Sequence, residues 1–382
     1  MIKLKRTSIN IYPYRITEAR EVRKFNISQL AEQIGLTRQA VSRYENGLAN
    51  PSDGVISKIA ECLDFPEGFF YKPSNNDILE GAVFFRTFKS SEVAERRMLE
   101  IKLKWIGEAY RFLNDSLYMP TLNLPTIDLM LNKPNFANSD FEEIAGLVRR
   151  HWELGDGPID NLAYTMEKNG IILSGVEIDS DKTDACSIIS DGKPIVLYNK
   201  KLRSASRIRF SLAHELGHVL LHSHITPEDL KDKKVLDNIE FEANYFAGAF
   251  LMPSNTFRND VHSYNLQSFL LLKDKWRVSI AAMLYRCKNL EIIDEELFSL
   301  LFRQLSFKRW RKVEPLDDRI PIELPKLLKN ALEYLINKKA VSFQQIKGSF
   351  LWNTKDLTDI FCVPDSFFEK DTDMTPYLSL IK

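Results

Sequence analysis

Hydrophobic and polar positions divide the 382-residue chain into stretches of different periodicity. Apolar residues recur at helical spacing over 15–70, which predicts five short helices. The same spacing over 91–117 predicts one long amphipathic helix, which Pro120 and Pro125 close. The polar run 73–81 between them predicts a linker. Beyond residue 140 the pattern is mixed, with helices expected at 141–152, 160–169, 204–223, 237–251 and 265–273, and β-branched strand-like runs at 171–178, 185–190 and 194–198.

These elements predict an α+β chain, because a helical part is followed by helices mixed with a small sheet. The length suggests two or three cores rather than one. The expected parts are an all-α domain at 1–72, a linker with the long helix at 73–125, a mixed domain at 126–300 and a helical C-terminal extension at 301–382.

The segment 28–47 predicts a helix-turn-helix. Ser28 can cap the first helix, Gly35 can end it in the left-handed conformation, and Thr37 can cap the second helix, which stops at Gly47. The expected buried positions are Leu30, Ala31 and Ile34 in the first helix and Ala40, Val41 and Tyr44 in the second. In such a motif the second helix reads the major groove of DNA.

The outward side chains of this motif suit a double-stranded DNA operator. Arg and Gln can pair with base edges, while hydroxyl and amide groups bind phosphates. The candidate DNA-binding residues are Gln29, Thr37, Arg38, Gln39, Ser42 and Arg43. Residues 1–43 also carry nine Lys or Arg against three Glu, a local balance of +6. The stretch 12–70, with Arg43-Tyr-Glu-Asn-Gly47 and Asn50-Pro-Ser52, resembles the Cro/cI-type (XRE) helix-turn-helix family. A bundle that mediates only protein contacts is the alternative.

A second group of residues predicts a metal centre. His214 and His218 lie one helical turn apart, so both imidazoles project from one face and can share a zinc ion, one per chain. Glu215 follows the first ligand and can act as general base, the arrangement H-E-x-x-H of metallopeptidases. The surrounding helix is apolar nearly all round, so these three polar side chains would be costly to bury unless a metal satisfied them.

A catalytic zinc site needs a third protein ligand. His224 has the spacing of the metzincin histidine, but Leu221 stands where that class needs Gly. His222 is rotated away from the pair and is expected at the rim or behind the ligands. The next helix offers Glu242, which we prefer, and Glu240, which is expected almost as well placed on the same flank.

Here the resemblance to a family is close. His214-Glu-Leu-Gly-His218, then Glu240-x-Glu-Ala-Asn-x-Phe-Ala and Leu251-Met-Pro253, resemble the ImmA/IrrE metallopeptidases over about 140–295. The resemblance implies a zincin-like, gluzincin-like domain that hydrolyses peptide bonds. It also implies a protein substrate, typically a helix-turn-helix repressor or antitoxin-type partner, cleaved in a stress, mobile-element or defence response. The run Phe84-Phe-Arg-Thr-Phe88 and the C-terminal extension are similar to those of fused members.

The expected mechanism uses zinc-bound water, whose pKa falls to about 7, and Glu215 as the proton acceptor. Candidate donors to the oxyanion are His262, Tyr245 and Arg207, and the sequence does not choose among them. The strand 185–190 is expected to be an exposed sheet edge along which a substrate could lie.

Composition leaves a second function open. The 52 basic and 52 acidic residues cancel, and no apolar run approaches the roughly 18–20 residues that cross a bilayer. The four scattered cysteines read as reduced thiols, so a cytoplasmic protein without a membrane partner is expected. The helix 91–117 could form a homodimer seam or pack within the chain. The alternative function is a catalytically silent transcriptional regulator or antitoxin that uses the peptidase fold as a sensor or interaction platform.

Overall fold

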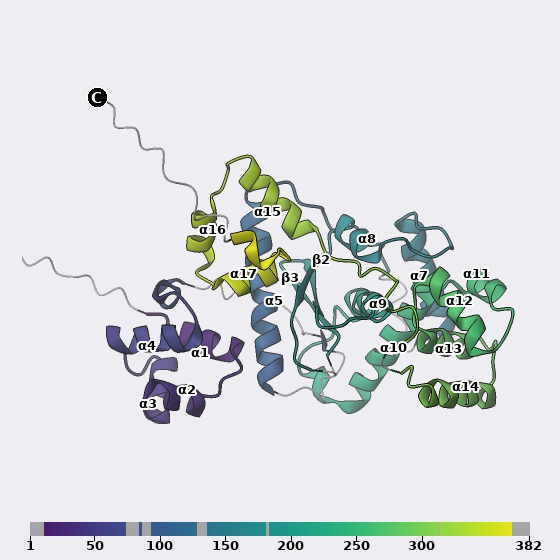
Figure 1. The fold of residues 1–382 in the computed structure, drawn as a ribbon, viewed down its shortest axis with the longest axis horizontal. Helices are drawn as coiled ribbons and strands as arrows, with labels where there is room; N and C mark the ends of the chain where they lie inside the picture. Colours follow the sequence, from purple (N-terminus) through teal and green to yellow (C-terminus); the bar gives the residue numbers. More distant parts are fainter. Residues whose placement is uncertain are drawn as a thin grey trace, which may run out of the picture. The chain divides into compact units, whose positions relative to one another are not determined.

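The structure, a computed structural model, describes residues 11–73, 84–85, 93–127, 136–180, 183–311 and 313–368 (Figure 1). Contacts divide the described chain into two compact units. The first contains the described residues of Met1–Ile78, Ser91–Ala109 and Lys329–Lys382, and the second those of Leu79–Ser90 and Tyr110–Leu328. None of the described helices is both long enough and apolar enough to span a membrane.

The first unit begins with the helix-turn-helix. Its elements are α1 (Pro13–Val22), α2 (Ile27–Ile34), α3 (Arg38–Glu45), α4 (Asp53–Leu63) and the 3-10 helix η1 (Glu67–Tyr71), which confirms the five short helices. Ser28 does not cap α2: Asn26 accepts the Gln29 N–H at 2.9 Å while the Gln29 side chain accepts the Asn26 N–H at 2.8 Å. This reciprocal capping box satisfies two free N–H groups, which places the helix start earlier. Gly35 has φ +71°, and Thr37 accepts the Ala40 N–H at 3.2 Å, as expected for the two ends of the turn.

The rest of the first unit comes from both sides of the second unit in the sequence. It contains residues 93–109 of α5 (Val93–Asn114), most of α15 (Leu327–Asn337), α16 (Phe343–Phe350) and α17 (Thr354–Ile360). The buried carboxylate of Asp356 accepts a hydrogen bond from Arg23 at 2.8 Å and also pairs with Lys102. Trp105 donates to Glu18 at 2.7 Å and stacks on Trp352 with 4.8 Å between ring centroids.

The C-terminal extension therefore differs from its expectation as a separate part. Residues 329–368 pack with the helix-turn-helix and α5, whereas 301–328 belong to the second unit. The physical reason is that the aromatic and charged groups of α17 and its surroundings find their partners on α1 and α5. Pairing of this kind between distant segments leaves no periodic signal in the sequence.

The second unit is built around a four-stranded sheet in the order β1-β3-β4-β2. The strands are β1 (Phe84–Phe85), β2 (Ile172–Val176), β3 (Ala185–Ser190) and β4 (Lys193–Asn199), so the three expected strands are confirmed. β2 runs parallel to β4, and β3 runs antiparallel to it. The unexpected strand β1 pairs antiparallel with β3, with Phe84 opposite Ser187 and Phe85 opposite Cys186. The expectation of β3 as an exposed edge is thereby wrong at these positions, while Arg86–Phe88 of the motif lie outside the described residues.

Helices complete the core of the second unit. They are α7 (Asn138–His151), α8 (Leu162–Lys168), α9 (Ala205–Leu221), α10 (Lys233–Leu251), α11 (Ser254–Asp260), α12 (Leu266–Trp276), α13 (Ile280–Asn289) and α14 (Glu295–Phe307), with the 3-10 helix η3 (Asp229–Lys231). α9 contacts β3 and β4 on one side and α10 on another (Figure 1). Gly217 permits the close helix pair, because a Cβ there would lie 3.2 Å from the Cα of Ala243. This approach brings side chains of α10 to the histidines of α9.

Candidate metal centre

The helix α9 carries three buried polar side chains on one face. Ser204 caps the helix by accepting the Arg207 N–H at 3.3 Å, and nearly every later position is buried. His214 and His218 are 0% exposed and Glu215 is 1% exposed. These groups lose their water on folding, so each needs a partner within the protein or an ion.

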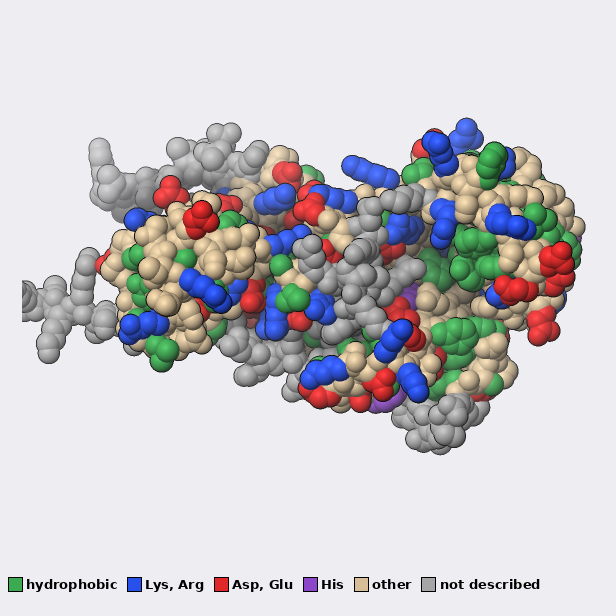
Figure 2. Space-filling view, turned by 90° about the horizontal axis from the view of Figure 1, so that it is seen from below, with side chains coloured by type: hydrophobic (Ala, Val, Ile, Leu, Met, Phe, Trp, Pro, Cys, Tyr) green, Lys and Arg blue, Asp and Glu red, His purple; other side chains and the backbone are tan. Residues whose placement is uncertain are grey.

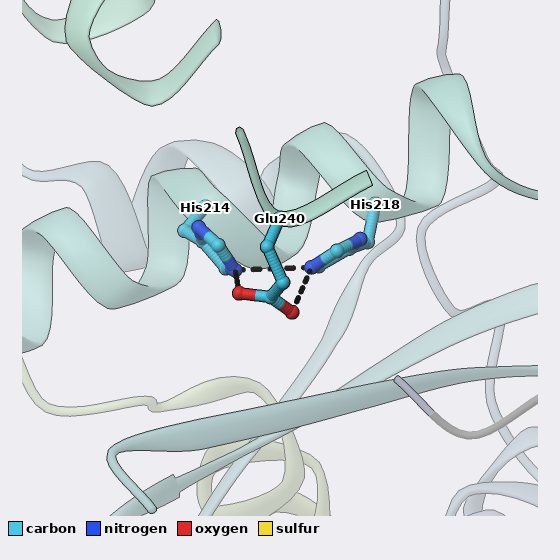
Figure 3. Close-up of side chains that lie close together, drawn as sticks. All are labelled: His214, His218 and Glu240. Atoms are coloured by element: carbon cyan, nitrogen blue, oxygen red, sulfur yellow. Dashed lines mark hydrogen bonds and ion pairs between the residues drawn. The ribbon is translucent and has the colours of Figure 1, made fainter. Parts of the chain in front are cut away.

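The helix α10 supplies the third member of the cluster. Asp232 caps it by accepting the Lys234 N–H at 2.8 Å. Glu240 then places its two carboxylate oxygens 3.5 Å from the Nε2 atoms of His214 and His218, which are 3.0 Å from each other. Figure 3 shows the carboxylate facing both imidazoles. The ligand atoms of these three residues all lie within 4.8 Å of one another.

In this geometry Glu240 lies with the two histidines, and the preferred Glu242 does not. The Glu242 carboxylate lies 2.9 Å from His222 Nε2 instead. Two positions along an α-helix differ by about 200° in direction, so Glu240 and Glu242 do not share a flank, contrary to the expectation. Glu240 is in phase with Ala243 and Asn244, one turn later, and these residues face α9.

Asn244 fixes the orientation of His214. Its amide nitrogen donates to the backbone oxygen of Glu240 at 2.7 Å, so its oxygen is directed at His214 Nδ1, 3.1 Å away. An amide oxygen can only accept, so His214 carries its hydrogen on Nδ1. In the neutral imidazole this leaves the lone pair of Nε2 directed at the cluster.

His222 and Glu242 fix the orientation of His218. His222 donates from Nε2 to the Glu242 carboxylate at 2.9 Å, which leaves its Nδ1 to accept from His218 Nδ1, also 2.9 Å away. Burial lowers the pKa of both His218 and His222 to about 4, so both rings are neutral at pH 7. His218 therefore also carries its hydrogen on Nδ1, and its Nε2 faces the cluster. Hydrogen bonds behind a ligand of this kind hold metal-binding histidines in orientation.

The donor set fits a cation. Two imidazole nitrogens 3.0 Å apart and a carboxylate can bind a positive ion together. Ligands about 2.05 Å from a tetrahedral zinc ion are about 3.3 Å apart. The observed spacings of 3.0 and 3.5 Å bracket that value.

Glu215 has a partner that the sequence did not suggest. Ser187 on β3 donates from Oγ to the Glu215 carboxylate at 2.6 Å, and both residues are buried. This bond holds one carboxylate oxygen toward the sheet. The sequence carries only weak signals for Ser187 and Asn244. Ser187 is a polar residue in an apolar strand, and Asn244 lies one helical turn after Glu240.

A cleft of about 1330 Å³ is connected to the cluster through Asn244, which contacts His214, while the three cluster residues themselves do not line it. Its lining includes Asn244, Asp184, Tyr245 and Arg207, so two of the three candidate oxyanion donors lie here; the exposed His262 is not among the described lining residues. Arg207 is already held by Asp184 through two hydrogen bonds of 2.7 Å. On the face drawn in Figure 2, hydrophobic side chains gather at the right of the view next to Lys and Arg side chains.

The candidate DNA-binding residues lie together on the helix-turn-helix. Gln29, Thr37, Arg38, Gln39 and Arg43 are exposed and Ser42 is half-buried. The motif's core consists of Leu30, Ala31, Ile34 and Val41, which are buried, whereas the expected core residues Ala40 and Tyr44 are only half-buried. The Gln29 side-chain oxygen serves the α2 cap, which leaves its amide hydrogens to reach a phosphate.

Comparison with known proteins assigns both segments to families. Residues 16–70 match the helix-turn-helix family, and residues 174–288 match the IrrE N-terminal-like domain, a peptidase M78 family. The chain thus carries a DNA-binding helix-turn-helix domain followed by an IrrE-like domain of metallopeptidase type, in an α+β architecture.

Two curated relatives are both transcription regulators by name. An HTH-type transcriptional regulatory protein of Methanocaldococcus jannaschii is 32% identical over 100 residues, 26% of this chain and 27% of that protein. The HTH-type transcriptional repressor RghR of Bacillus subtilis is 44% identical over 55 residues, 14% of this chain and 41% of that protein. The matches span less than half the length of either relative.

Proposed function

We propose that the chain is a DNA-binding regulator whose IrrE-like domain is a zinc-dependent endopeptidase. The observation that carries the proposal is the cluster of two buried histidines and a half-buried glutamate, whose ligand atoms all lie within 4.8 Å of one another. His214, His218 and Glu240 would hold one zinc ion. Burying two imidazoles beside a carboxylate costs free energy, and a bound cation would offset that cost.

Glu215 is the general base of the proposed reaction. Bound zinc supplies a Lewis acid that makes water a nucleophile near neutral pH. The Glu215 carboxylate accepts the proton of the attacking water and returns it to the leaving amine. The Ser187 hydroxyl orients this carboxylate by donating a hydrogen bond to it. Tyr245 and Arg207 line the adjoining cleft and are the better placed candidates for holding the oxyanion.

The expected substrate is a regulatory protein. Both relatives are named as transcription regulators, and the chain's own helix-turn-helix would bring the peptidase to a DNA operator where such proteins gather. We therefore propose a helix-turn-helix repressor or antitoxin-type partner as the substrate, in the cytoplasm. A homodimer would allow two helix-turn-helix motifs to bind two half-sites.

The test compares cells that express the wild-type chain with cells that express Glu215→Gln. New protein N-termini are identified by terminal labelling and mass spectrometry. Termini that appear only with the wild type, from a protein that the purified zinc-loaded chain also cuts, are the expected result. Identical termini in both cells would refute peptidase activity and favour the silent regulator, the alternative function.

A further inference from the structure

The outer edge of β3 lies beside the proposed general base. Ser187, in the middle of β3, donates to Glu215 at 2.6 Å. One edge of β3 pairs with β4, so a further strand can join only at the other edge. An extended peptide that joins there passes along the strand that holds Glu215, and such strand addition is a common mode of peptide binding.

A segment of this chain already lies on that edge. The two residues of β1 pair antiparallel with β3, with Phe84 opposite Ser187 itself. Phe85 is opposite Cys186, so the segment runs toward the start of β3. Asp184, the residue before β3, belongs to the lining of the cleft beside the metal cluster. A substrate peptide bound in the same direction would lead into this cleft.

We propose that Phe84–Phe85 is an internal inhibitor, which occupies the peptide-binding edge of β3 and competes there with substrate. The inference rests on the proposed function, since it takes this edge as the substrate site. A tethered segment acts at an effective concentration of about 1 mM, so a free peptide of equal intrinsic affinity must approach that concentration to displace it. Release of β1 would then couple a signal to proteolysis.

The test measures binding rather than hydrolysis. The probe is a fluorescein-labelled peptide with the sequence of residues 80–90, titrated with the full-length chain in a Glu215→Gln background so that the probe is not consumed. Gln can still accept from Ser187, so the β3 edge keeps its form. Fluorescence anisotropy gives the dissociation constant.

Two single variants, Phe84→Pro and Phe85→Pro, provide a matched pair. In an antiparallel ladder only one of two adjacent residues directs its N–H at the partner strand, so only one of the two prolines removes a ladder bond. That variant is expected to bind the probe about ten-fold more tightly than the wild type, because its internal competitor is lost. The other proline variant and Phe84→Val/Phe85→Val, which keep the bond, should bind like the wild type.

Hydrogen exchange provides a second readout. The amides of β3 that face β1 should exchange faster in the proline variant that binds the probe, while those that face β4 and the amides of α9 keep their protection and so report an intact fold. Equal probe affinity and equal exchange in all variants would overturn the proposal. If the proline variant binds the probe more tightly but no chain cuts any protein, competition by β1 is supported and peptidase activity is refuted. The two hypotheses can therefore fail separately.

Discussion

The two carboxylates of α10 give the sharpest test of the metal centre. Glu240→Gln and Glu242→Gln make the same chemical change two residues apart, so each is the control for the other. Glu240 faces both imidazole nitrogens at 3.5 Å, whereas Glu242 contacts only His222 at 2.9 Å. We expect Glu240→Gln to lose zinc and Glu242→Gln to retain most of it.

The magnitudes follow from the two roles. Structural zinc sites bind with about 10–16 kcal/mol, or about 2.5–4 kcal/mol for each of four ligands, so loss of one ligand lowers affinity by about 10²–10³-fold. Loss of a hydrogen-bond partner behind a metal ligand lowers zinc affinity by about 10–100-fold. Gln at position 242 can still accept a hydrogen bond from His222, so Glu242→Gln should lower zinc affinity by only about 10-fold.

The assay is competition for zinc against a chromophoric chelator, with bound metal also measured by mass spectrometry at matched protein concentration. Unfolding curves of the metal-free proteins serve as the control for folding. Zinc lost mainly in Glu242→Gln and kept in Glu240→Gln would refute the reasoning and restore Glu242 as the ligand. A wild-type chain that takes up no zinc would remove the metal centre altogether.

Three further predictions concern other parts of the chain. Asp356→Asn leaves two basic partners of a buried carboxylate unpaired and should cost about 3–5 kcal/mol in denaturant unfolding, while the exposed Glu61→Gln should have little effect. Burial raises the pKa of Asp356, but Lys102 and Arg23 lower it more, so the folded-state pKa lies below the unfolded one. The carboxylate therefore contributes its full stabilisation to the free energy of unfolding above about pH 4, and this contribution is lost as the pH falls through the folded-state pKa. Gln39→Ala should weaken binding to a DNA site selected from random sequences by about 1–3 kcal/mol. Lys58→Ala on α4 is the control, and an equal loss of affinity in both variants would contradict the role of α3 as the reading helix. A thiol reagent should label two of the four cysteines in the native chain, since Cys186 and Cys287 are buried and burial raises the pKa of Cys287 to about 12; four rapid labels would contradict the buried positions.

Local patterns predicted most of the elements. The strands at 171–178, 185–190 and 194–198 and the helices at 204–223 and 237–251 were expected within a few residues of β2, β3, β4, α9 and α10. These elements have apolar positions at a regular period, and the period is a property of the sequence alone. The short β1 escaped prediction because two residues carry no period.

The sequence by itself also determined the pair His214 and His218 with Glu215, because their spacing on one helix places them together wherever that helix lies. The third ligand was different. Its choice depends on which face of α10 meets α9, and that face is set by the close approach at Gly217 and Ala243, a contact between distant segments.

The remaining features of the site and the division into units were decided only by tertiary structure. Ser187 reaches Glu215 across 28 residues of sequence, and Asn244 reaches His214 across 30. Asp356 joins Arg23 across 333 residues, which places residues 329–368 in the unit of the helix-turn-helix. Interactions inside one helix follow from residue spacing. Contacts between distant segments depend instead on which surfaces pack together, and that packing is determined by the shape and burial of the whole fold.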